Sequence, residues 1–156
     1  MLTIETCYVL HPIGSAYHEI CQGETPWVAL GNFMNDFFGY ASEQRQALLQ
    51  EPCILPAEPS REQIQWAVFC AASVDYLCHH YDLQVPSWVH ETQYTTLPEP
   101  WYHGLGAKKP HIQERLRNET PQEFASRNIY CGSADRVFPD KYRAVSHQWQ
   151  EQRQSA

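Results

Sequence analysis

The stretch SREQIQWAVFCAASVDYLCHHY, residues 60–81, carries the strongest structural pattern in the chain. Ser60 and Gln63 have the spacing of a capping box, in which each side chain bonds the backbone amide of the other residue. Apolar residues then follow on nearly every side of the expected helix, from Ile64 to Leu77. A helix without a polar face is typical of the centre of a bundle or of a subunit interface. We therefore expect a central apolar helix over about 61–81.

The rest of the sequence predicts shorter helices around this one. Thr25 and Thr120 each precede a proline. This pair favours a helix start, because Thr can accept a bond from a free amide and Pro fits the first helical position. Between 82 and 110, prolines followed by aromatic residues are typical of loops held against a core. We expect a mainly α fold, a single compact helical domain over 1–150 with Pro- and aromatic-rich loops, at most a short strand or hairpin, and a polar tail at 151–156.

The charge is distributed unevenly along the chain, whose net charge is −7. Residues 1–104 contain twelve acidic and two basic side chains, whereas residues 105–156 contain six acidic and nine basic ones. A negative net charge disfavours a role in coating nucleic acid or an anionic membrane, because like charges repel. We expect the basic C-terminal third to pair with the acidic body, and any arginine left over to mark a contact surface.

The sequence predicts a cytoplasmic protein without a membrane partner. No apolar run approaches the roughly 20 residues that cross a bilayer. The start of the chain has no basic segment before an apolar one, so we expect no secretory signal. The six cysteines include no C-x-x-C pair. They are typical of buried free thiols in a reducing compartment.

One local set of residues has the spacing of a metal site. Asp75, His79 and Asp82 follow one another by four and three positions, which places them on one face of a helix. A carboxylate–imidazole–carboxylate row can hold a divalent ion such as zinc or manganese, and the alternative function is then a metal-dependent hydrolase. The other interpretation is a helix C-terminus, where histidines interact favourably with the helix dipole, and we prefer this one, without a cofactor.

The motifs of common enzymes are missing from the sequence. There is no G-x-S-x-G nucleophile elbow, no H-E-x-x-H zinc motif and no glycine-rich loop of the phosphate-binding type. This favours a protein that is not an enzyme. The arginines of the C-terminal third, interleaved with tyrosines, suggest nucleic-acid binding as a weaker alternative, which the acidic net charge disfavours.

Residues 85–130 contain a further pattern of prolines, aromatic residues and arginines. It consists of V-P-x-W at 85–88, L-P-x-P-W-Y at 97–102, Arg115, and T-P-x-x-F-x-x-R-N-I-Y at 120–130. This pattern resembles the C-terminal region of a loose group of uncharacterised bacterial proteins. Some of those carry an N-terminal helix-turn-helix and lie beside nucleotidyltransferase-like genes, an arrangement similar to toxin–antitoxin pairs. No helix-turn-helix pattern is present here, so the resemblance implies a helical module that binds another protein.

These observations together predict a non-catalytic protein-binding module of a bacterial or phage-type system, antitoxin-like in its role. Its partner is another protein or a second copy of the chain. Interface hot spots prefer aromatic residues and arginine. The residues expected to contact the partner are Trp101, Tyr102, Arg115, Arg127 and Tyr130.

Overall fold

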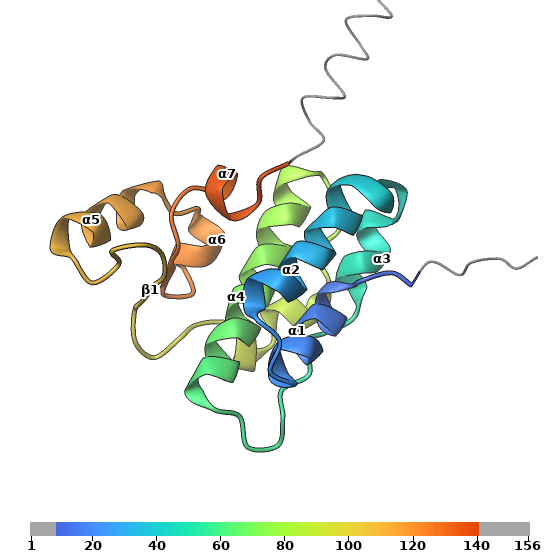
Figure 1. Ribbon diagram of the computed structural model, residues 1–156, viewed down its shortest axis with the longest axis horizontal. Helices are drawn as coiled ribbons and strands as arrows, with labels where there is room; N and C mark the ends of the chain where they lie inside the picture. Colours follow the sequence, from blue (N-terminus) through green and yellow to red (C-terminus); the bar gives the residue numbers. More distant parts are fainter. Residues whose placement is uncertain (1–8, 141–156) are drawn as a thin grey trace, which may run out of the picture.

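Helix α4 (Arg61–His80) runs through the middle of the structure, with other helices on both sides of it (Figure 1). The computed structural model describes residues 9–140. The expected capping box is present: Ser60 Oγ accepts a hydrogen bond from Gln63 N at 3.1 Å, and Ser60 N donates to Gln63 Oε1 at 2.9 Å. Most side chains between Trp66 and Cys78 are buried. The central helix and the mainly α fold are therefore confirmed.

The elements before α4 lie together on one side of it (Figure 1). One charged group anchors the start of this part, because the buried Asp36 Oδ2 accepts a hydrogen bond from His11 N at 2.7 Å. The elements are α1 (Ile13–Cys21), α2 (Pro26–Asn35), the π-helical turn η1 (Asp36–Tyr40), the 3₁₀ turn η2 (Ser42–Gln44) and α3 (Arg45–Gln50).

The elements after α4 are short, and loops join them. They are the 3₁₀ turns η3 (Ser87–His90) and η4 (Thr92–Tyr94), strand β1 (Trp101–Tyr102), helices α5 (Pro110–Glu119) and α6 (Gln122–Ala125), strand β2 (Ile129–Tyr130) and helix α7 (Ala134–Val137). In Figure 1, β1, α5, α6 and α7 lie on the side of α4 opposite α3, whereas Trp88 of η3 contacts Leu49 of α3.

The two strands form a parallel pair. Trp101 faces Ile129 and Tyr102 faces Tyr130 in this register. A hairpin would give an antiparallel pair, whereas parallel strands need a crossover connection, which here contains α5 and α6. The pairing therefore carries the chain after β2 back toward α4, where the short helix α7 follows.

Aromatic rings form much of the contact between α4 and its neighbours. The buried Phe69 ring lies 5.2 Å from Trp66, 5.3 Å from Phe124 of α6 and 5.8 Å from Trp27 of α2, measured between ring centroids. The contacts with Trp66 and Trp27 are edge to face, a geometry that adds stabilisation to the burial of apolar area. Phe69 thus joins the elements on both sides of the central helix.

The two threonines expected to cap helices make no such bond. Helix α2 begins at Pro26 as predicted, but the side chain of Thr25 accepts no cap hydrogen bond. The hydroxyl of Thr120 instead donates to the carbonyl of Leu116 at the end of α5 and accepts a hydrogen bond from Gly132 N at 2.9 Å. Thr120 therefore ties the end of α5 to the segment that follows β2.

Residues 9–140 include no helix with the length and apolar character needed to span a lipid bilayer. The predicted domain end at residue 150 and the polar tail at 151–156 lie outside the described residues.

Replacing Ser60 by Ala should lower the free energy of unfolding by about 1 kcal/mol, because one free amide of the first turn of α4 loses its acceptor. Thr25→Ala is the matched control: the Thr25 side chain caps nothing, so the free energy of unfolding of this variant should stay within about 0.5 kcal/mol of the wild-type value. Urea denaturation followed by tryptophan fluorescence measures both. Equal losses in the two variants would contradict the assigned capping box.

Candidate functional site

Arg127, expected on a contact surface, lies in the interior. Its side chain is 5% exposed. Nη1 donates to Asp75 Oδ2 of α4 at 2.9 Å and to the Glu123 carbonyl at 2.8 Å. Nε donates to the Tyr94 carbonyl at 3.1 Å, and Nη2 to the Val89 carbonyl at 3.3 Å. A buried guanidinium needs such partners, because an unpaired buried charge is very costly. Arg127 therefore joins α4, α6 and the η3–η4 segment, and a partner protein cannot contact its guanidinium.

The three residues of the predicted metal set are not brought together. Asp75 is held by Arg127, and its Oδ1 lies 3.2 Å from Nδ1 of His79. Helix α4 ends at His80, and Asp82 follows in a left-handed conformation with φ of 55°. The row therefore breaks before its third member, because the chain leaves the helix.

Glu123 of α6 lies near His79 in place of Asp82. Its Oε1 is 3.4 Å from His79 Nδ1. No sequence pattern marked this neighbour, because α6 is far from α4 along the chain. Among residues 9–140, no group of three His, Cys, Asp or Glu side chains is placed to hold a metal ion. The alternative of a zinc or manganese hydrolase stays a prediction.

The strand pair arranges the predicted aromatic residues on two opposite faces. Alternate side chains of a strand point in opposite directions. Trp101 packs against Trp66 of α4, with ring centroids 5.2 Å apart, whereas Tyr102 stacks on Tyr130 at 5.0 Å. Arg117 Nη1 donates to the hydroxyl of Tyr102 at 3.0 Å. Trp101 thus belongs to the contact with α4, and the two tyrosines form a half-buried pair.

Arg115 lines a pocket of about 320 Å³. Arg136 of α7 lies in the same pocket, and the lining contains no carboxylate. We call it the arginine pocket. Its lining residues come from α2, the loop after β1, α5, the segment after β2 and α7: Trp27, His103, Gly104, Leu105, Arg115, Leu116, Cys131, Gly132, Arg136 and Val137.

Leu105 stands at the rim of the arginine pocket and is 99% exposed. The glycines on either side of it, Gly104 and Gly106, have φ of 143° and 72°. Residues other than glycine rarely adopt such φ values, so this loop conformation requires glycine on both sides of Leu105. An isolated exposed leucine is common on proteins. Here, however, it lies beside the exposed part of Trp27 and two arginines, and the surface is therefore a candidate contact site.

His103 forms one wall of the arginine pocket, and its imidazole ring lies among three tryptophan rings. The His103 ring lies 5.6 Å from Trp27, 5.4 Å from Trp66 and 5.2 Å from Trp101. Burial lowers the pKa of His103 below its usual 6.5, because desolvation disfavours the charged form. His103 is therefore neutral at pH 7, and the positive charge of the pocket comes from Arg115 and Arg136.

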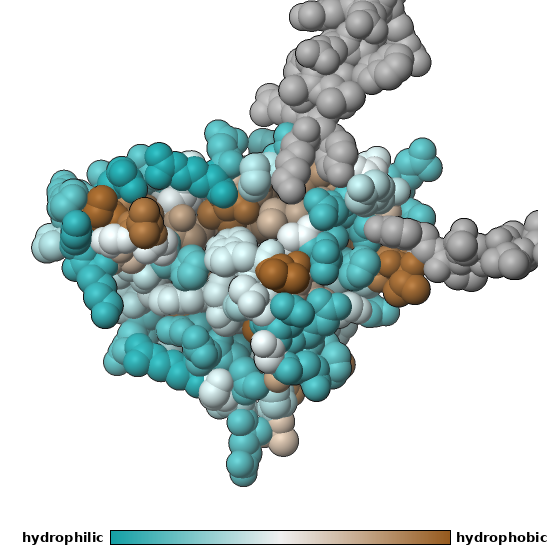
Figure 2. Space-filling model, in the orientation of Figure 1, coloured by the Kyte–Doolittle hydropathy of each residue, from teal (hydrophilic) through white to brown (hydrophobic). Residues whose placement is uncertain are grey.

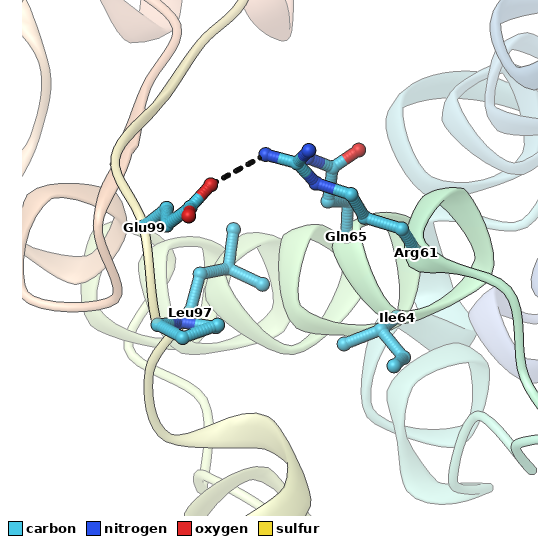
Figure 3. Close-up of a pocket in the computed structure, with 6 residues that line it drawn as sticks. Arg61, Ile64, Gln65, Leu97 and Glu99 are labelled. Atoms are coloured by element: carbon cyan, nitrogen blue, oxygen red, sulfur yellow. Dashed lines mark hydrogen bonds and ion pairs between the residues drawn. The ribbon is translucent and has the colours of Figure 1, made fainter.

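A second pocket, of about 420 Å³, lies between α4 and the segment before β1 (Figure 3). Ile64, Leu97 and Pro98 give it an apolar lining. Arg61 Nη2 lies 2.8 Å from Glu99 Oε2, and both side chains are exposed. Because these opposite charges pair with each other, this pocket has no unmatched charge to select a ligand.

The residues of the 85–130 pattern have structural contacts. Trp88 Nε1 donates to the Leu49 carbonyl at 3.1 Å, and Phe124 is fully buried. Asn128 adopts a left-handed conformation with φ of 65°, and its Nδ2 donates to the Leu97 carbonyl at 3.0 Å. Asparagine tolerates this conformation better than most residues. The pattern thus describes how this part of the chain packs.

Comparisons with protein-family models, curated proteins and solved structures found no match for the chain. The resemblance to antitoxin-like proteins remains a prediction.

Replacing either Asp75 or Arg127 by Ala should lower the free energy of unfolding by about 3 kcal/mol, because the remaining charge stays buried without its partner. The loss of unfolding free energy in the double variant should be smaller than the sum of the two single losses by at least about 1 kcal/mol. This difference is the coupling energy of the pair, and urea denaturation of the three variants measures it. The exposed Arg61–Glu99 pair is the control, and its coupling should stay below about 1 kcal/mol. Additive losses at 75 and 127 would count against the buried pair.

The purified chain should contain no stoichiometric zinc or manganese, and adding either metal should leave Tm unchanged, because Arg127 holds one oxygen of Asp75. Elemental analysis and thermal denaturation measure this. One equivalent of metal that is lost in a His79→Ala variant would establish the alternative metal site.

Proposed function

We propose that the chain is a non-catalytic protein-binding module, antitoxin-like in its role and cytoplasmic in a bacterial or phage-type system. The observation that carries this proposal is the arginine pocket with Leu105 at its rim. The contact surface consists of Trp27, Leu105, Arg115 and Arg136. Of the five residues that the sequence indicated, this surface includes Arg115 alone. It leaves out the buried Arg127 and also Trp101, Tyr102 and Tyr130.

The energetics of this surface support the proposal. Covering a fully exposed leucine contributes about 1.5–3 kcal/mol to association. Tryptophan and arginine are enriched among the residues that dominate binding energies. The surface lies on an acidic protein but presents two guanidiniums, which adds charge selectivity to the apolar contact.

Three thiols of residues 9–140, those of Cys53, Cys78 and Cys131, also favour a non-catalytic protein. Burial raises the pKa of Cys78 to about 11 and that of Cys131 to about 12. Burial likewise raises the pKa of Cys53 well above its usual value. A thiol must lose its proton to act as a nucleophile, so these three are unreactive at neutral pH.

Replacing Leu105 by Glu should weaken binding of the natural partner at least tenfold, because the apolar contact is lost and a carboxylate is added beside the interface. The chain, tagged and expressed in its native host, is cross-linked, purified and examined for a protein present at a fixed stoichiometry. Ile54→Glu is the matched control, since Ile54 is 78% exposed but does not line the arginine pocket. The wild type and the Ile54→Glu variant should capture the same protein.

Two results would overturn the proposed function. One is a chain that captures no protein at a fixed stoichiometry in its own host. The other is a partner that binds the Leu105→Glu variant as tightly as the wild type, which would exclude this surface.

A further inference from the structure

We infer that the arginine pocket binds a carboxylate of an acidic peptide segment, and that a large apolar side chain next to this carboxylate packs on Leu105. This inference rests on the proposed protein-binding function and names the chemistry of the partner. Figure 2 shows the surrounding face: apolar patches lie in the region of α5 and between α5 and α2, within a mainly hydrophilic surface.

Two arginines of the arginine pocket, Arg115 and Arg136, lack strong partners within the described residues. Arg115 Nε lies 4.0 Å from Glu119 Oε2, at the outer limit of an ion pair. Within residues 9–140, no hydrogen bond or ion pair is found for the side chain of Arg136. Two incompletely paired guanidiniums in one pocket without a carboxylate complement an anion.

The other described arginines are all engaged elsewhere. Arg61 pairs with Glu99, and Arg127 pairs with Asp75. Arg45 Nε donates to the Phe37 carbonyl at 2.9 Å, and Arg117 donates to Tyr102. The arginine pocket therefore holds the guanidiniums that the fold itself does not use.

The lining favours a carboxylate beside an apolar group over a phosphate-rich ligand. A guanidinium binds a carboxylate through two parallel hydrogen bonds. Leu116 and Val137 supply apolar walls, and Leu105 supplies an apolar rim. The net charge of −7 repels ligands with several negative charges, such as nucleotides, more strongly than a single carboxylate.

The pocket also has room for such a group. Its volume of about 320 Å³ lies at the lower end of the range for ligand sites, and exceeds that of one acidic side chain. Gly132 contributes backbone without a side chain, and a Cβ added there would lie 3.3 Å from Leu116 Cδ2. Its φ of 89° is one that other residues rarely adopt.

The test selects peptides from a phage-displayed library of random sequence on the immobilised full chain. The selected peptides should share an Asp or Glu next to a large apolar residue. Synthetic copies should bind with an affinity that falls as salt rises, because the contact is ionic. In NMR titrations they should shift the backbone amides of Gly104 and Gly132 and the indole N–H of Trp27.

Arg115→Glu and Arg136→Glu should each weaken peptide binding about tenfold or more. Arg61→Glu is the matched control: it changes the net charge equally but lies in the other pocket, so it should leave binding within about twofold. All three sites are exposed, and circular dichroism should show that each variant keeps its fold.

Several results would overturn the inference. Selected peptides without acidic residues, or binding unchanged by Arg115→Glu and Arg136→Glu, would exclude the carboxylate while leaving the protein-binding function intact. Inorganic phosphate that shifts the same amides when the peptides do not would identify a phosphate site instead. Failure to enrich any peptide would overturn the inference, and the capture experiment with Leu105→Glu would then decide the proposed function separately.

Discussion

The buried ion pair between Arg127 and Asp75 is the interaction on which the C-terminal half of the structure depends. Arg127 carries a charge into the interior, and its guanidinium bonds place α6 and the η3–η4 segment against α4. The backbone next to it continues the arrangement: Leu97 N donates to the Arg127 carbonyl, and Trp101 N donates to that of Asn128. These bonds bring β1 beside β2, and the two chain segments that leave the strand pair form walls of the arginine pocket. The position of the proposed binding site therefore depends on the buried ion pair of Arg127 and Asp75.

The parts of the fold that local chemistry determines could be predicted from the sequence. The capping box at Ser60 and Gln63 needs only residues three positions apart, and α4 follows from its own apolar pattern. The role of Arg127 could not be predicted in the same way, because its partners Asp75, Val89 and Tyr94 are distant along the chain. Asp82 shows how sensitive such spacing arguments are to the end of a helix. The turn after His80 is enough to remove it from the row that it would share with Asp75 and His79.

The candidate site was predicted in part for the same reason. Arg115 stood out as a basic residue of the C-terminal third, but Trp27, Leu105 and Arg136 become neighbours only through the tertiary fold. The uneven charge of the chain now has a physical interpretation. Arg127 pairs with the acidic body as the charge distribution predicted, whereas Arg115 and Arg136 remain at the surface, where they supply the charge of the arginine pocket.

We conclude that one buried ion pair, Arg127 with Asp75, holds in place the part of the chain that presents the arginine pocket. Hydrogen exchange in an Asp75→Ala variant tests it most directly, because the amides of Trp101 and His103 are bonded across the strand pair. We expect these amides to lose about a hundredfold in protection, while amides in the middle of α4 lose much less. Equal loss of protection in both places, or no loss at Trp101 and His103, would contradict it.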